Sequence, residues 1–260
     1  MRLSAAAVVL SSLTCIVAQS ATPDVQDIIK KSVEANQRDY EADPKYNYKE
    51  RDRDGNQTKT YQITMIEGTP YQRLIAINGK PLPKDQADAE MKKQEQAAEQ
   101  RKSESAADRQ KRIQKFQRDR ERDHNMMDQL TVAFNFTLVG QHRVRGYSVW
   151  ALKAIPKPGY NPPNRDTQVL TGMQGELWIN QKNYQWVRVT AEVMHPVSIE
   201  GFLARVEPGT RFELTKAPVG DGSVWLAAHF TERASAKVLG VFSHHEQEDN
   251  TFFDYELAKQ

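Results

Sequence analysis

The fold is decided by GELWINQKNYQWVRVTAEV, residues 175–193, which predicts two β-strands joined by a polar turn. In the first strand, Leu177 and Ile179 point away from Trp178, because neighbouring side chains of a strand alternate between faces. The second strand alternates in the same way, with Val187, Val189, Ala191 and Val193 on one face and Trp186, Arg188, Thr190 and Glu192 on the other. One face is therefore core, and the other mixes aromatic and polar groups.

Outward from this hairpin, similar strand patterns recur at spacings near ten residues, separated by glycine-rich or polar turns. The predicted strands are YNYKERDRD, KTYQITMIE, YQRLIAI, LTVAFNFTLVG, YSVWALKAI, VLTGMQGELWI, WVRVTAEV, IEGFLARV, TRFELTK, SVWLAAHFTERA, KVLGVFSHH and TFFDYEL. Eleven or twelve strands are too many for a flat sheet, so the sheet must curl. The sequence thus predicts an α+β fold, a curved antiparallel half-barrel of roughly eleven strands in a single domain, residues 21–260.

Two segments are predicted to be helical. Residues 22–43 place Val25, Ile28, Ile29 and Val33 at helical spacing, which indicates an amphipathic helix that covers the sheet. Residues 84–128 lack Gly and Pro and hold 12 Lys/Arg and 11 Asp/Glu with few apolar side chains. This insertion is interpreted as a solvated helix or helical hairpin that projects from the fold, and a partner-binding helix is the alternative.

The N-terminus predicts export. A basic start, an apolar run and small residues at its end are typical of a secretory signal peptide, residues 1–20. A retained anchor and a lipoprotein modified at Cys15 are the alternatives. Cys15 is the single cysteine of the chain, so the mature protein has no disulfide. We expect a secreted, most simply periplasmic, protein without a transmembrane segment.

The four tryptophans are the candidate ligand-binding residues. Trp150, Trp178, Trp186 and Trp225 lie on strands of the same run, and an aromatic set on the mixed face would line a groove for an apolar ligand. The alternative is that the helix over residues 23–43 packs on these rings.

The hairpin also carries a resemblance. A strand Gly-x-Leu-Trp-Ile-Asn, a polar turn and Trp-Val-Arg-Val are similar to the central hairpin of LolA-like periplasmic proteins, which include lipoprotein carriers and regulators of envelope-stress sigma factors. The resemblance spans residues 130–257, and residues 24–80 more weakly. It implies an unclosed sheet with helices across its mouth and a cavity that takes acyl chains. The charged insertion at 84–128 departs from that pattern.

Enzymatic signals are weak. Nucleophile elbows, zinc-protease helices, phosphate loops and dinucleotide motifs do not occur in the sequence. His244 and Glu246 could share a metal ion and support a hydrolase, but we expect no metal, no cofactor and no catalytic residues. A formal net charge of +2 excludes a strong electrostatic preference for nucleic acid.

The leading hypothesis from the sequence is a non-enzymatic envelope protein that binds a lipid or a lipoprotein acyl chain in the half-barrel. The alternative is a protein-interaction or sensory module of the envelope, with the helix at 84–128 as its contact surface and an envelope protein as its partner.

Overall fold

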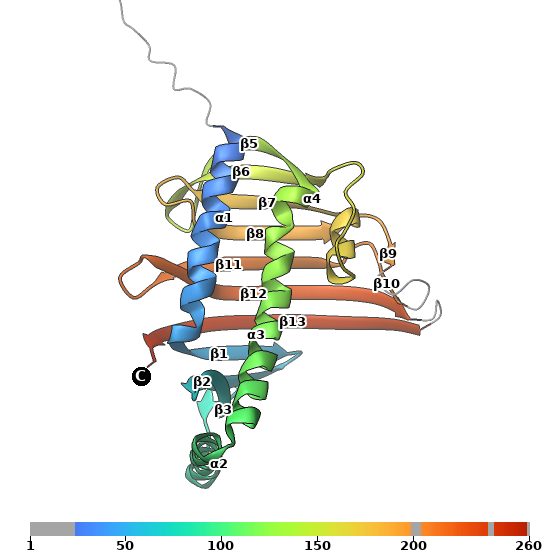
Figure 1. Ribbon diagram of the computed structural model, residues 1–260. Helices are drawn as coiled ribbons and strands as arrows, with labels where there is room; N and C mark the ends of the chain where they lie inside the picture. The colour runs from blue at the N-terminus through green and yellow to red at the C-terminus, as the bar shows by residue number, and fades with distance from the viewer. Residues whose placement is uncertain (1–23, 199–203, 239–241, 259–260) are drawn as a thin grey trace, which may run out of the picture.

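The computed structural model describes residues 24–198, 204–238 and 242–258 (Figure 1). The helices are α1 (Val25–Ala42), α2 (Lys84–Ser103), α3 (Ala106–Asp128) and α4 (Leu130–Ala133), with 3-10 helices η1 (Asp43–Lys45) and η2 (Asp166–Gly172). The strands are β1 (Tyr46–Asp54), β2 (Gln57–Ile66), β3 (Thr69–Ile77), β4 (Lys80–Pro81), β5 (Phe134–Val144), β6 (Tyr147–Pro156), β7 (Met173–Asn180), β8 (Trp186–Val193), β9 (Val197–Ser198), β10 (Ala204–Val206), β11 (Arg211–Val219), β12 (Val224–Val238) and β13 (Phe242–Leu257). The predicted export signal and Cys15 lie outside the described residues.

All strand pairs are antiparallel, and the sheet is open. Within the described part of the chain, eleven strands follow one another in the order β4-β3-β2-β1-β13-β12-β11-β8-β7-β6-β5, while β9 and β10 join on at β12. The N-terminal hairpins therefore meet the rest of the sheet through β1 and the last strand, β13. The predicted α+β fold, with an unclosed sheet of about eleven strands, an N-terminal helix and an inserted helix, is confirmed.

Helix α1 packs on one face of the sheet, as its apolar spacing predicts. Asp24 caps its start by accepting a hydrogen bond from the Gln26 amide (2.9 Å), which satisfies one of the free N–H groups of the first turn. Ile28 and Ile29 are fully buried in the main core. We call the face that α1 covers the helix-covered face, and its opposite the outer face.

The inserted segment is a helical hairpin, but its second helix does not project. Ser105 caps α3 through the Asp108 amide, which separates α3 from α2. Figure 1 shows α3 crossing the strands on the same face as α1, while α2 lies beside β3 at the end of the sheet. Met126 and Met127 pack against the main core. The expectation of a purely projecting helix is therefore wrong for α3, because Ile113 lies against the turn at Gly68 and the two methionines pack against the core.

A β-bulge divides the hairpin at residues 175–193 in a way that alternation could not predict. Trp178 pairs with Arg188, but Ile179 pairs with Trp186, so Val187 has no partner. Trp186 joins Ile179 in the main core, and Val187 joins Trp178 in a separate cluster. The prediction that Trp186 shares a face with Arg188, and Val187 with Val189, is wrong for this reason.

Three predicted strands also differ from the structure. Residues 130–133 form helix α4, and residues 166–172 form η2 before β7 begins. The segment KVLGVFSHH is not a separate strand: its two ends belong to β12 and β13, which are 15 and 16 residues long. Because the other strands recur about every ten residues, the sequence pattern divides these two longer strands into three.

Candidate functional site

The helix-covered face holds a row of apolar cross-strand partners that becomes less buried along the sheet. Cross-strand partners point to the same face, and the row runs through Leu152, Leu177, Val189, Leu214 and Phe230. Leu152 is 0% exposed, Leu177 4% and Val189 7%, whereas Leu214 and Phe230 are only half-buried. The apolar face is thus fully closed over β6 to β8 and only partly closed over β11 and β12.

Aromatic side chains continue this partly closed region onto β13 and β1. Phe252 lies two residues beyond the partner of Phe230 and therefore points to the same face. Tyr48 lies 6.1 Å from Phe252 and stacks on Tyr255 at 5.1 Å between ring centroids. Tyr48, Phe252 and Tyr255 are all half-buried. The helix-covered face therefore offers an aromatic surface that the two helices do not completely cover.

Carboxylates border this aromatic surface. Glu50 is the cross-strand partner of Phe252, and Asp52 is the partner of Asn250 on the same face. Burial raises the pKa of the Glu50 carboxyl, and the neighbouring charges of Asp52 and Glu248 raise it further. A ligand at this place would meet negative potential. A neutral or positively charged head group fits that potential, and a free carboxylate does not.

Helix α3 is joined to α1 mainly by polar and aromatic contacts. The His124 ring stacks on Tyr40 of α1 with centroids 4.1 Å apart. Arg120 donates to the Tyr40 carbonyl, and its guanidinium lies 4.1 Å from the Tyr40 ring centroid. Burial raises the pKa of the Asp43 carboxyl, and Arg120 opposes that shift. Water can replace most of these contacts, so the cost of separating the two helices here is lower than for an apolar interface of equal size.

The N-terminal part of α3 is also held by polar contacts, here with the turn between β2 and β3. Arg112 forms an ion pair with Glu104 and donates to the Thr69 hydroxyl (2.6 Å) and the Glu67 carbonyl (3.0 Å). The apolar contact at this end is small, where Ile113 lies against the turn at Gly68. Apart from the apolar contacts of Ile113, Met126 and Met127, the described contacts of α3 with the sheet are thus chiefly polar.

Helix α1, by contrast, is held by a buried ionic network. The Lys216 ammonium donates to Asp39 (2.6 Å) and to the Asn36 amide oxygen (2.8 Å). The other Asp39 oxygen accepts from the Trp225 amide (2.9 Å) and from the Gln185 side chain (3.1 Å). Burial lowers the pKa of Lys216, and Asp39 opposes that shift. Removing any one partner would leave buried polar groups unsatisfied, so α1 is a fixed part of the fold.

The structure separates the four candidate tryptophans into two groups. Trp150 is half-buried on the helix-covered face, 5.4 Å from the Tyr184 ring, and Trp186 is fully buried nearby in the main core. Trp178 and Trp225 belong to the separate cluster with Val187. Trp178 lies under the Arg188 guanidinium (4.9 Å) and Trp225 is 2% exposed. They do not line one groove together, and ligand contact by any of them stays a prediction.

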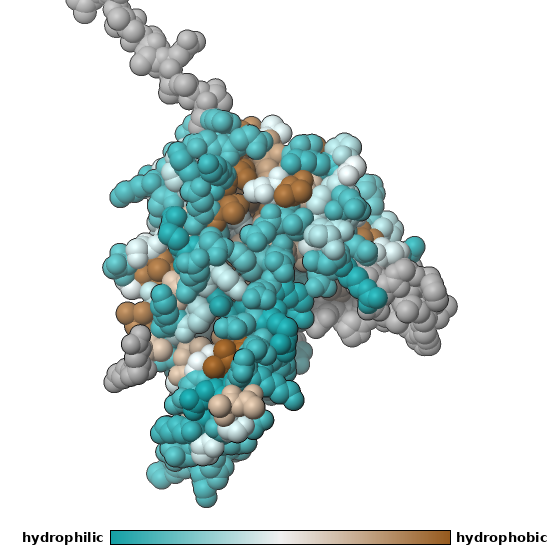
Figure 2. All heavy atoms as spheres, in the orientation of Figure 1, coloured by the Kyte–Doolittle hydropathy of each residue, from teal (hydrophilic) through white to brown (hydrophobic). Residues whose placement is uncertain are grey.

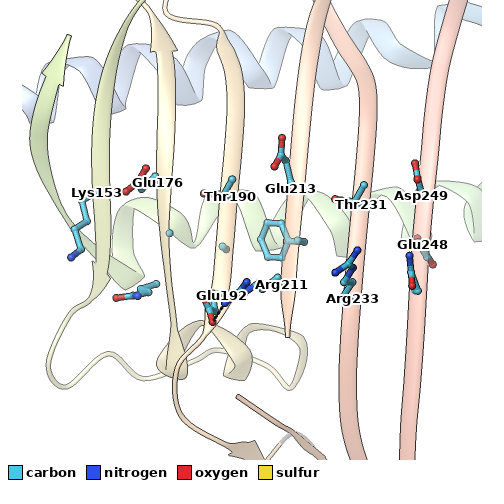
Figure 3. Close-up of a pocket in the computed structure, with 15 residues that line it drawn as sticks. Lys153, Glu176, Thr190, Glu192, Arg211, Glu213, Thr231, Arg233, Glu248 and Asp249 are labelled. Carbon is cyan, nitrogen blue, oxygen red and sulfur yellow. Dashed lines mark hydrogen bonds and ion pairs between the residues drawn. The ribbon is translucent and has the colours of Figure 1, made fainter. Parts of the chain in front are cut away.

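The outer face carries a polar groove of about 560 Å³ (Figure 3). Its lining residues come from six neighbouring strands, β6, β7, β8, β11, β12 and β13. Several charged side chains on this face already form ion pairs with each other. Arg211 binds Glu192 (2.8 Å) and Arg188 binds Glu213 (2.7 Å). The groove has no apolar surface comparable to the helix-covered face, so it does not suit an acyl chain.

The two proposed metal ligands, His244 and Glu246, lie at alternate positions of β13, but their side chains are outside the described set. Among the described residues, no group of three or more His, Asp, Glu or Cys side chains could hold a metal ion. Within the same residues, no helix has the length and apolar character needed to span a membrane.

Sequence reasoning missed the site residues that the structure brings together. Tyr48 and Tyr255 are 207 positions apart and meet because β1 pairs with β13. Lys216 and Asp39 are separated by 177 positions. The sequence signal that could have pointed to the network is the polar pair Asn36 and Asp39 on the side of the helix that also carries Ile28 and Ile29.

The buried tyrosines predict a loss of stability at alkaline pH. Burial raises the pKa of Tyr48 and of Tyr255 above the ordinary value of 10.0. Above pH 10 the unfolded chain loses phenolic protons that the folded chain keeps, so the free energy of unfolding falls as pH rises. In Tyr48→Phe, the slope between pH 10 and 11.5 should be shallower by up to about 1.4 kcal/mol per pH unit. Denaturant titrations at several pH values measure this slope, with Tyr71→Phe as control. Equal slopes in wild type and Tyr48→Phe would contradict the assignment.

Comparison with known proteins gives structural likeness alone. No family model and no curated protein matches the chain. A putative outer membrane lipoprotein-sorting protein domain from Vibrio parahaemolyticus matches with 10% identity and a TM-score of 0.31, over 88% of this chain and 93% of that one. A DUF1329 family protein from Desulfovibrio piger matches with 10% identity and a TM-score of 0.32, over 91% and 94%. MucB in complex with MucA(peri) matches with 8% identity and a TM-score of 0.26, over 91% and 100%. These matches include the group that the hairpin resembles, and at this level they assign no function and no residue.

Proposed function

We propose that this protein is a non-enzymatic binding protein, exported to the cell envelope, that holds the acyl chain of a lipid or lipoprotein on the helix-covered face beneath α3. The observation that carries the proposal is the incomplete burial of Leu214, Phe230, Phe252 and Tyr48 on a face that two helices already cover. Each buried methylene contributes about 0.8 kcal/mol, so an acyl chain on this surface gains affinity without a charged anchor.

The role of α3 follows from how it is attached. Its contacts with α1 and β3 are chiefly polar, and they can be exchanged for water when the helix lifts. Helix α1, fixed by the Asp39 network, stays in place. We therefore assign α3 as a lid over the binding surface, and its outward movement would admit the chain. Figure 2 shows apolar patches between the hydrophilic surfaces of the helices.

The site is tested with adjacent residues that point to opposite faces. Phe252 faces the helices, and Phe253 faces outward, where Arg51 lies 5.2 Å from its ring centroid. N-phenylnaphthylamine, an uncharged apolar dye, fluoresces when it enters an apolar site. Phe252→Glu should lose most dye binding, because it places a charge on the acyl surface, and Phe253→Glu should retain it. Circular dichroism verifies that both variants fold. Equal dye binding by folded variants would refute this site.

The lid is tested by loosening it. Arg120→Ala removes the contacts with Tyr40 and Asp43, whereas Arg118→Ala changes an exposed residue of the same helix. Loss of the charged hydrogen bond of Arg120 corresponds to roughly a tenfold increase in the fraction of molecules in which α3 is lifted. The dye should therefore enter Arg120→Ala roughly tenfold faster than wild type in stopped-flow fluorescence, and Arg118→Ala at the wild-type rate. If all three proteins took up dye at one rate, α3 would not be the lid.

A further inference from the structure

The outward side of α3 sorts the charges of this helix by sign. Lys111, Lys115 and Arg118 follow one another at spacings of four and three residues, which places them on one stripe of the helix. All three are exposed. The opposite side carries Ile113 and Arg120, which touch the rest of the fold, and beyond the stripe, near the end of the helix, Met126 packs against the main core. The nearly equal numbers of Lys/Arg and Asp/Glu in residues 84–128 therefore conceal a basic outer stripe on α3.

The acidic residues of α3 border the stripe, and Asp108 and Asp119 lie three residues before Lys111 and four residues after Lys115. At 100° per residue, Asp108 and Asp119 fall toward one flank, and Glu121 falls on the other margin. The stripe spans about 10 Å, since seven residues rise about 1.5 Å each. Figure 2 shows that the surface over this helix is hydrophilic. The stripe thus has charge without an apolar anchor.

We propose that the basic stripe of α3, defined by Lys111, Lys115 and Arg118, docks the protein on an anionic membrane surface. A straight row of long basic side chains can contact a plane of phosphate head groups simultaneously, with no shape to match. Protein interfaces, in contrast, are depleted of lysine at their centres and usually contain aromatic anchors, and this stripe contains none. The lysines and the missing aromatic anchor therefore favour anionic lipid over an acidic protein.

Docking through α3 would place the proposed lid itself against the membrane. The stripe faces away from the sheet while the contacts of Arg112 and Arg120 face it, so one helix carries both functions on opposite sides. Contact of the stripe with the membrane does not require an acyl-chain site. A second step, in which docking helps α3 to lift from the sheet, rests on the proposed function. The two proposals can consequently fail separately.

Vesicle co-sedimentation tests the docking. Wild-type protein should bind vesicles of phosphatidylglycerol and phosphatidylcholine at low salt, release them as salt rises, and not bind pure phosphatidylcholine. The double variant Lys111→Glu/Lys115→Glu should bind at least twentyfold more weakly, because each basic residue near the surface contributes about fivefold. The matched control, Lys153→Glu/Lys182→Glu, makes the same change of charge at exposed positions outside α3 and should stay within about threefold of wild type.

Three outcomes would overturn the proposal. Equal loss in the control variant would show that net charge, not the stripe, determines binding. Binding to phosphatidylcholine alone would show that charge is not involved. Binding to soluble polyglutamate as tight as to the anionic vesicles would indicate an acidic protein partner instead. Uptake of N-phenylnaphthylamine by Lys111→Glu/Lys115→Glu, measured without vesicles, should equal that of wild type, which separates failure of docking from failure of the acyl site.

Discussion

Replacement of Asp39 by alanine is expected to lower the free energy of unfolding by about 3–5 kcal/mol. The carboxylate is 3% exposed and accepts from the Lys216 ammonium, the Trp225 amide and the Gln185 side chain. Without it, the Lys216 charge remains buried at 9% exposure, and among the described residues Asn36 is its remaining hydrogen-bond acceptor. Urea denaturation followed by tryptophan fluorescence measures the loss.

The controls for Asp39→Ala separate a buried charge from a charge in general. Asp27→Ala removes a carboxylate from the same helix, but the pair of Asp27 with Lys31 is exposed, so its stability should stay close to that of wild type. Asp39→Leu/Lys216→Met replaces both charges by apolar groups and should recover part of the lost stability. A loss below about 1 kcal/mol in Asp39→Ala would show that the network does not fix α1 on the sheet.

The second large effect is expected at Gly175, where the decisive hairpin begins. A Cβ atom there would lie 2.4 Å from the Thr190 carbonyl oxygen and 3.4 Å from Ala191, both in the backbone of the paired strand. Backbone cannot move aside as a flexible side chain can, so Gly175→Ala should force β7 and β8 apart. We expect a destabilisation of about 3 kcal/mol, at the upper end for an overpacked site.

Gly140→Ala is the matched control for this prediction. Gly140 also lies in a strand, but its nearest neighbour is the His142 side chain at 3.3 Å, which can rotate. Thermal unfolding should show a large decrease of the midpoint for Gly175→Ala and a small change for Gly140→Ala. Similar midpoints in both variants would mean that the close approach of β7 and β8 at this position is not tight.

Local patterns predicted most of the architecture because they depend on few residues. Alternation and turn residues indicated the antiparallel sheet, and the spacing of Ile28 and Ile29 indicated the helix that packs on it. The bulge at Val187 could not be predicted, since an unpaired residue leaves no mark in the alternation of its own strand. Its effect was large, because it moves Trp186 from the face assigned by alternation into the core.

The site itself was beyond sequence reasoning for a different reason. The pairing of β1 with β13 creates the aromatic surface, and nothing local to Tyr48 or Phe252 specifies that pairing. The position of α3 was equally hidden. Its composition predicts a solvated helix, whereas in the structure Met126 and Met127 pack against the core and Arg112 and Arg120 bind the neighbouring elements.

The central claim, that an acyl chain binds beneath α3, is tested most directly by photolabelling. A neutral acyl amide that carries a diazirine is bound to the mature protein, irradiated, and mapped by mass spectrometry of peptides. We predict labels on the helix-covered face of β1 and β13, at or next to Tyr48 and Phe252, and stronger labelling in Arg120→Ala. Labels confined to the outer face, at Phe253 or Trp178, or no labelling above that of a non-binding control protein, would contradict the claim.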